Sequence, residues 1–140
     1  MTKSARIWLF IAGISGACAV ALGAYGAHGL NDGPEYLRES FNTGVQYQMW
    51  HTLALIGVAW ICTQGGRAGK LASFAGCAFS TGIVVFSGSL YYFGLNGELL
   101  VNGAPPLGGF SYMAGWCLLG FSGWYTKDTE KAASITRDDL

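Results

Sequence analysis

Few side chains in this sequence have the chemistry of a reactive or ligand-binding site. Seven stand out, namely two imidazoles, two amides, two hydroxyls and a phenol: His28, Gln46, Gln48, His51, Ser87, Ser89 and Tyr92. An imidazole can bind a metal, ligate haem iron or exchange a proton, and amides and hydroxyls can orient it. Tyr47 and Gln48 precede His51 by four and three residues, so on a helix both can support its ring from one face. These seven residues form the candidate polar cluster.

A purely structural role is the alternative for this cluster. An imidazole or amide inside an apolar layer costs several kcal/mol unless it is paired, so each needs a hydrogen-bond partner on a neighbouring helix. Such bonds fix the packing of a bundle without any ligand. The sequence also lacks paired acids inside its apolar segments, nucleotide-binding loops and metal-ligand clusters. We therefore predict no catalytic residue, no metal site, no cofactor and no enzymatic activity.

Four long segments without a charged side chain must position these polar residues. Asp, Glu, Lys and Arg are absent from residues 7–31, 40–66, 71–97 and 99–126. An α-helix rises about 1.5 Å per residue, so each segment can cross a hydrocarbon core of about 30 Å. Only 11% of all residues are charged, against about 25% in soluble domains. The pattern predicts an all-α integral membrane protein that folds as a four-helix bundle.

The joints between these segments set the expected boundaries. We predict spans at about residues 7–27, 44–63, 71–93 and 109–126, in one domain over residues 1–126 that is followed by a polar cytoplasmic tail at 127–140. Residues 31–35 carry helix-starting signals, so the second helix should begin near Pro34, ahead of its span. Residues 94–109 contain two prolines and several glycines, which predicts a connection that is not helical throughout.

Basic residues concentrate on one side of the predicted bundle. Seven of the eight lysines and arginines lie before the first span, between the second and third, or after the fourth, and only Arg38 lies on the other side. Basic residues are retained preferentially on the cytoplasmic side of a membrane. We therefore predict that both termini are cytoplasmic. The net charge of zero gives no reason to expect a nucleic-acid partner.

Small residues within the spans indicate close helix packing. Pairs four residues apart, such as Ala17 and Ala21, let helix backbones approach in lipid, either within one chain or against a second copy or a partner. The four cysteines all fall inside spans, and we interpret them as small apolar packing residues. Four aromatic residues fall near predicted span ends, as an aromatic belt requires: Trp8, Trp60, Tyr92 and Trp124.

Four motifs in fixed order resemble one known family. They are residues 23–30 (GAYGAHGL), 41–51 (FNTGVQYQMWH), 86–91 (FSGSLY) and 106–110 (PLGGF) followed by Gly115 and Trp116. Over residues 13–124 the chain resembles the uncharacterised membrane family called domain of unknown function 423. The resemblance implies four spans and a place in the bacterial inner (plasma) membrane. The family also includes a mitochondrial relative, and it has no established biochemical activity. Six members of the candidate cluster and Pro106 match the family pattern, which assigns them no role.

Three functions from different classes remain open. The first, which we favour, is a non-enzymatic accessory or assembly subunit of a larger membrane complex. The second is a quinone-, haem- or lipid-binding or redox-linked module, in which His28 and His51 could contact the ligand. The third is a small oligomeric transporter or channel, since the similar segments 41–45 and 79–83 lie on spans of opposite direction. The spans are apolar on the cytoplasmic side, so transport would need a pore between subunits.

Overall fold

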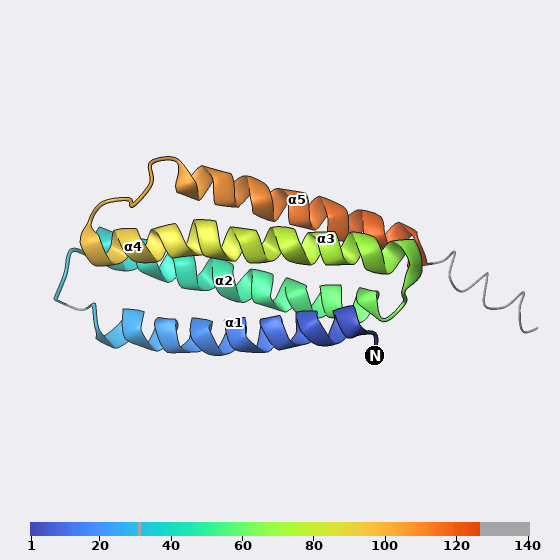
Figure 1. The fold of residues 1–140 in the computed structure, drawn as a ribbon. Coiled ribbons are helices and arrows are strands. Elements are labelled where there is room, and N and C mark those ends of the chain that lie inside the picture. Colours follow the sequence, from blue (N-terminus) through green and yellow to red (C-terminus); the bar gives the residue numbers. More distant parts are fainter. Residues whose placement is uncertain (31, 127–140) are drawn as a thin grey trace, which may run out of the picture.

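The computed structural model describes residues 1–30 and 32–126, and these residues form four long helical rods that run alternately up and down (Figure 1). The rods are α1 (Lys3–His28), α2 (Glu35–Cys62), a continuous third rod made of α3 (Gly66–Gly82), a π-helical turn η1 (Ile83–Ser87) and α4 (Gly88–Asn96), and finally α5 (Ala104–Trp124). No strand occurs in the described part of the chain. The all-α four-helix prediction is confirmed, and the predicted tail at 127–140 lies outside the described residues.

Short connections make neighbouring rods antiparallel. The hydroxyl of Thr2 caps α1 by accepting a hydrogen bond from the backbone N–H of Ala5 at 3.2 Å. The same hydroxyl donates to the carbonyl of Cys62 at 2.9 Å, which ties the start of α1 to the end of α2. The turn between α2 and α3 passes through Gly65 and Gly66, whose φ angles of 69° and 56° favour glycine.

The fourth helix begins earlier than the sequence suggested. We expected its span from residue 109, after a connection interrupted by proline, but α5 begins at Ala104 with Pro105 and Pro106 in its first turn. Prolines are tolerated there because the first N–H groups of a helix have no partner within it. Since α4 continues to Asn96, the connection that is not helical covers only residues 97–103.

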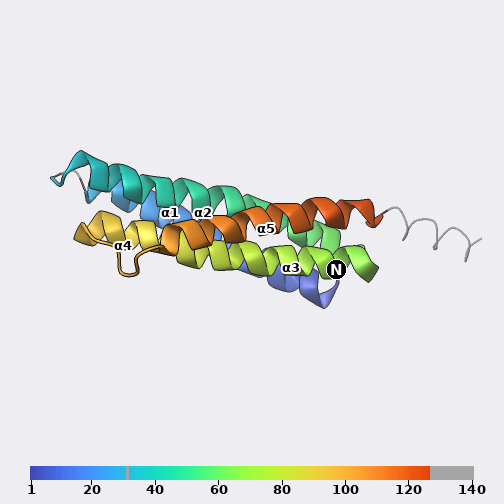
Figure 2. The same cartoon turned by 90° about the horizontal axis from the view of Figure 1, so that it is seen from above.

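The rods pack in a defined order. In Figure 1 they appear from bottom to top as α1, α2, the third rod and α5, and their main contacts follow this order. Figure 2 shows α5 in front of the boundary between α2 and the third rod. Helix α5 packs chiefly along α3, and α1 packs chiefly along α2. The two outer rods therefore each leave a large surface outside the bundle.

The two ends of the bundle differ in charge. The start of α1, the turn between α2 and α3 and the end of α5 lie together at one end, on the right of Figure 1. Four basic residues of the described ranges belong to this basic end: Lys3, Arg6, Arg67 and Lys70. The connections before α2 and before α5 lie at the opposite, acidic end. This arrangement agrees with the predicted grouping of charges.

Small residues bring α1 close to α2. A stripe at every seventh position of α1 is buried, which matches one face of a helix: Ala5, Ala12, Ala19 and Gly26. Small side chains allow the close backbone approach on which helix association in lipid depends. Ala17 and Ala21 are exposed on the outer face of α1 instead. Thus only part of the predicted small-residue pattern serves packing within this chain.

One residue of the predicted aromatic belt has a different role in the structure. Trp8 is buried, and its indole N–H donates to the hydroxyl of Ser73 at 3.3 Å. It is therefore a packing residue between α1 and α3, because the absence of a side chain at Gly76 makes room for its ring. Trp124, by contrast, is 81% exposed, as expected of an aromatic belt.

The cysteines do not all pack inside the bundle. Cys62 is buried and contacts Ser73, but Cys18, Cys77 and Cys117 are exposed on the outer faces of their helices. All four are free thiols. The interpretation as packing residues therefore holds within the chain for Cys62 only.

Candidate functional site

The candidate polar residues do not form one cluster. His28 is the last residue of α1 and is exposed, and Gln46 is exposed on α2. His51 lies sixteen residues into α2, about 24 Å from its start at 1.5 Å per residue. Its ring neighbours come from α2, α3 and α5. The two histidines therefore do not face a common ligand.

Gln48 joins three helices. Its amide nitrogen donates to the backbone carbonyl of Ser15 on α1 at 2.9 Å, and its amide oxygen accepts from the hydroxyl of Tyr91 on α4 at 2.6 Å. The hydroxyl of Ser15 in turn lies 2.6 Å from that of Thr52 on α2. Both ends of the buried amide are thus paired, which removes the penalty for placing it in an apolar layer.

Sequence reasoning did not include Ser15, Tyr91 and Thr52 in the candidate cluster. A signal was available for two of them, because Ser15 lies between the buried positions Ala12 and Ala19, and Thr52 follows Gln48 by four residues. Residues three and four apart share a helix face. The facing stripes of α1 and α2 therefore bring the two hydroxyls together.

The His51 ring accepts one hydrogen bond and donates another. The indole N–H of Trp116 donates to Nε2 at 3.2 Å, so Nε2 must be an acceptor. Nδ1 then carries the proton and donates to the backbone carbonyl of Tyr47 at 2.6 Å. The ring is also stacked on Tyr112 from α5. The result is a neutral imidazole whose two nitrogens are both used.

The sequence predicted that Tyr47 and Gln48 both support the His51 ring, and this is correct for Tyr47 only. The backbone of Tyr47 does accept a hydrogen bond from the ring, and the Tyr47 ring lies 6.0 Å from it. Gln48 was expected to help as well, and this was wrong, because its amide faces Ser15 and Tyr91. The side chain turns toward α1 and α4 because those helices offer partners for both of its polar ends.

Ser87 lies in the π-helical turn η1 and faces α5. It is fully buried, and its hydroxyl lies 3.1 Å from that of Tyr112. The Tyr112 ring packs against the backbone of Gly82, where any Cβ atom would overlap it. Single π turns are rare inside α-helices and often occur at functional sites. Here the turn places a hydroxyl opposite the tyrosine that stacks on His51.

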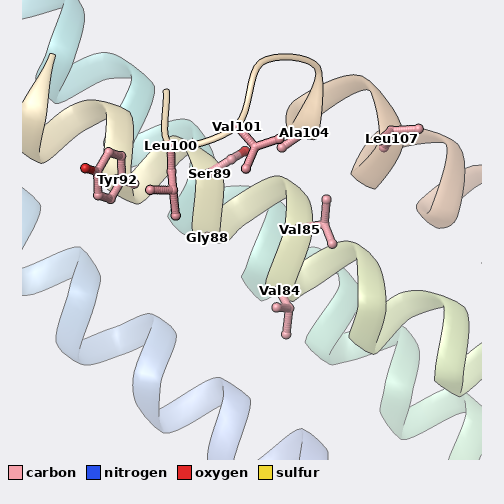
Figure 3. Close-up of a pocket in the computed structure, with 9 residues that line it drawn as sticks. All are labelled: Val84, Val85, Gly88, Ser89, Tyr92, Leu100, Val101, Ala104 and Leu107. Carbon is pink, nitrogen blue, oxygen red and sulfur yellow. The ribbon is translucent and has the colours of Figure 1, made fainter. Parts of the chain in front are cut away.

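Ser89 and Tyr92 line an apolar pocket near the acidic end. Figure 3 shows this pocket, of about 490 Å³, between η1, α4, the 97–103 connection and α5. Its other lining residues are Val84, Val85, Gly88, Leu100, Val101, Ala104 and Leu107. The Ser89 hydroxyl already donates to the carbonyl of Phe86 at 2.8 Å. The pocket therefore offers mainly hydrophobic contact.

An aromatic groove opens between α2 and α5. It has a volume of about 590 Å³ and runs beside His51. Tyr47, Trp50 and Phe110 are among its lining residues, together with both ring partners of His51, Tyr112 and Trp116. A flat or elongated apolar molecule is the kind of ligand that such a surface fits.

The outer surface and the lengths of the rods define the class of protein. Large apolar side chains are exposed on outward faces, for example Phe10 at 70% and Val84 at 73%. By length and composition, α1 and the rod Gly66–Asn96 qualify as membrane spans, with mean hydropathies of 2.0 and 1.6. Helices α2 and α5 have 28 and 21 residues, which is also enough to span a bilayer. The mean hydropathy of α2 is lowered by its polar residues, and that of α5 is lowered by its glycines, tyrosine and tryptophans. These features define a small helical membrane protein.

Comparison with known proteins identifies the family. The family described as "Protein of unknown function (DUF423)" matches residues 22–109, and the chain belongs to it. The UPF0382 inner membrane protein YgdD of Escherichia coli (strain K12) is 38% identical over 117 residues, which cover 83% of this chain and 88% of that protein. The UPF0382 membrane protein YwdK of Bacillus subtilis (strain 168) is 35% identical over 115 residues, which cover 81% and 93%. No solved structure matches the chain.

These relatives confirm the family and that its members are membrane proteins. A UPF0382 membrane protein of Haemophilus influenzae is also similar, with 35% identity over 121 residues that cover 86% of this chain and 95% of the relative. The names of these three relatives state a membrane location and give no activity.

Proposed function

We propose that this protein is a non-enzymatic accessory or assembly subunit of a larger membrane complex. The observation that carries the proposal concerns the buried polar residues of the described ranges, six of which make a side-chain hydrogen bond inside the bundle: Gln48, His51, Thr52, Ser87, Ser89 and Ser122. The hydroxyl of Ser80, a residue that is itself only partly buried, is the one buried side-chain polar atom of these ranges without a partner. A catalytic site needs polar groups that can bind substrate. Four of the six groups link different helices, whereas Ser89 and Ser122 bond to carbonyls of their own rod. They therefore serve the packing of the bundle, which leaves the outer surface for interactions.

Helix α1 has the surface best suited to a partner helix. It packs chiefly on α2, so much of its circumference faces outward. Ala17 and Ala21 are exposed on that side, one turn apart. Small residues at this spacing allow close approach of a second helix in lipid. A partner subunit or a second copy of this chain could use this face.

The proposed location is the bacterial inner membrane, with both termini in the cytoplasm. Support comes from the basic end of the bundle, which contains the first turn of α1 and the turn before α3. Arg38 belongs to the opposite end and lies 3.6 Å from Glu35, which partly offsets its charge. The charge asymmetry favours a cytoplasmic basic end. The name of the YgdD relative also states an inner membrane location.

Purification from native membranes tests the subunit proposal. The full chain, tagged and expressed at its natural level, is solubilised in a mild detergent, and co-purifying proteins are identified by mass spectrometry. We expect a stoichiometric membrane complex, and recovery of the bare protein would contradict the proposal. Ala17→Leu should reduce recovery of the partner. Ala114→Leu is the matched control, because Ala114 is an exposed alanine on α5.

A lipid- or quinone-binding module is the second candidate. The apolar pocket beside Ser89 and Tyr92 and the aromatic groove beside His51 favour it. Gly88 offers a sharp test, because it lines the pocket and a Cβ there would meet no atom within 4 Å. Gly88→Leu should fill the pocket and displace a ligand that co-purifies with the native protein. Gly120→Leu is the control, since Gly120 also has open space around it.

A further inference from the structure

The basic end of the bundle contains a pocket of its own. It has a volume of about 390 Å³ and lies between the start of α1 and the start of α3. Its lining includes Thr2, which caps α1, Ser4 from α1, and Gly65, Gly66, Lys70 and Phe74 from the turn and the third rod. Because α1 packs chiefly on α2, the boundary between α1 and α3 has few contacts.

One positive charge lines this pocket, that of Lys70. Lys3, Arg6 and Arg67 belong to the same end of the bundle, but Arg6 lines a separate pocket on α1 and Arg67 lies over the Tyr125 ring. The four acids of residues 1–30 and 32–126 belong to the acidic end, and Lys70 makes no ion pair within those residues. A pocket that is lined by a lysine and has no carboxylate nearby among the described residues attracts an anion. Four acids of the tail lie outside the described residues: Asp128, Glu130, Asp138 and Asp139.

The polar side chains of the pocket that remain free to bind a ligand can donate hydrogen bonds. The Thr2 hydroxyl is already used, since it bonds to Ala5 and to Cys62. The Lys70 ammonium and the Ser4 hydroxyl make no hydrogen bond within the described residues, and both line the pocket. Gly66, the first residue of α3, also lines the pocket, and no side chain caps this 17-residue helix. Several donors and one cation match the oxygens of a phosphate.

The pocket also has an apolar side. Phe74 follows Lys70 by one helical turn, lines the same pocket and is 64% exposed. Residues four apart lie one above the other on a helix. A ligand with a charged head beside Lys70 would therefore place its apolar part along Phe74. A soluble phosphate would use only the polar half.

We propose that this pocket binds the phosphate headgroup of an anionic phospholipid, with one acyl chain along the outer face of α3. Basic pockets between membrane helices on the cytoplasmic side bind lipid headgroups in this way. The site is independent of the subunit proposal, because it needs no protein partner.

Lipid titration followed by native mass spectrometry tests the site. The full-length protein in mild detergent is titrated with phosphatidylglycerol, with phosphatidylcholine and with glycerol phosphate. We expect the first phosphatidylglycerol to bind more tightly than phosphatidylcholine. Lys70→Gln should weaken that binding by about fivefold, the effect of one basic residue near an anionic lipid. Arg38→Gln, which removes one positive charge at the acidic end, should leave it unchanged.

Three results would overturn the proposal. Equal affinity for the two lipids would show that no anion is selected. Equal losses in Lys70→Gln and Arg38→Gln would show that only the total charge matters. Displacement of phosphatidylglycerol by glycerol phosphate at similar concentrations would indicate a soluble phosphate ligand. Phe74→Ser separates the two halves of the site, since it should weaken lipid binding and leave glycerol phosphate binding unaffected.

Discussion

The imidazole of His51 and the phenol ring of Tyr112 lie face to face, with centroids 3.5 Å apart and planes inclined by 10°. This stack joins α2 to α5, two helices that otherwise have few contacts because α5 packs chiefly along α3. Trp116 strengthens the link by donating a hydrogen bond to the same imidazole. His51 thus links α2 directly to the last helix through both a ring stack and a hydrogen bond.

Replacing His51 should therefore destabilise the protein far more than replacing His28. His51→Ala removes the stack and leaves the Trp116 N–H and the Tyr47 carbonyl without this partner, which costs about 1–3 kcal/mol. His28 is exposed at the end of α1, so His28→Ala should have no measurable effect. Thermal unfolding of the purified variants in one detergent measures the difference. Equal melting temperatures for the two variants would contradict this role of His51.

The hydrogen bond between Tyr91 and Gln48 should contribute measurably to stability. Tyr91→Phe removes a donor 2.6 Å from the amide oxygen of Gln48, and interhelical bonds in membranes are worth about 0.6 kcal/mol on average and up to about 1.7. A double-mutant cycle with Gln48→Leu isolates the pair energy. We expect a coupling at the upper part of that range, since both residues belong to a connected network. Strictly additive effects would show that the bond contributes nothing.

Close glycine contacts should tolerate no added methyl group. A Cβ at Gly115 on α5 would lie 2.6 Å from a ring atom of Phe79, a fully buried residue of α3. Gly115→Ala should thus destabilise the protein by about 1–3 kcal/mol through overpacking. Gly120→Ala on the same helix meets no atom within 4 Å and should be neutral or slightly stabilising. A similar loss of stability in both variants would argue against helix contact at Gly115.

Much of the fold was predictable because charge placement dominates in a membrane protein. The four uncharged segments predicted four helical rods, and the capping signals placed the start of α2 within one residue of Glu35. The start of α5 was missed, because Pro105 and Pro106 were interpreted as helix breakers when they form a first turn. The π turn at Ile83–Ser87 has no local signature in the sequence. Ser87 in this turn and Gly82 before it both contact Tyr112 of α5, a residue far away in the sequence.

The site was less predictable, because helical periodicity shows which residues share a face but not which neighbour that face meets. Gln48 and His51 were both correctly placed within α2, yet their partners come from different helices. Helix α1 packs on α2 and α5 packs on α3. Only this packing order shows that Ser15 is the partner of Gln48 and that Trp116 is the partner of His51. His28 and Gln46 were included by residue type alone, and both are exposed.

Cysteine labelling in intact bacteria tests the proposed orientation. In a chain whose four native cysteines are replaced by alanine, Asn102→Cys places one thiol in the connection before α5, and Gln64→Cys places one in the turn before α3. These connections belong to opposite ends of the bundle (Figure 1). If the basic end is cytoplasmic, a membrane-impermeant maleimide should label the thiol at 102 in intact cells and reach the thiol at 64 only after lysis. The reverse pattern would place both termini outside and would remove the charge argument on which the orientation rests.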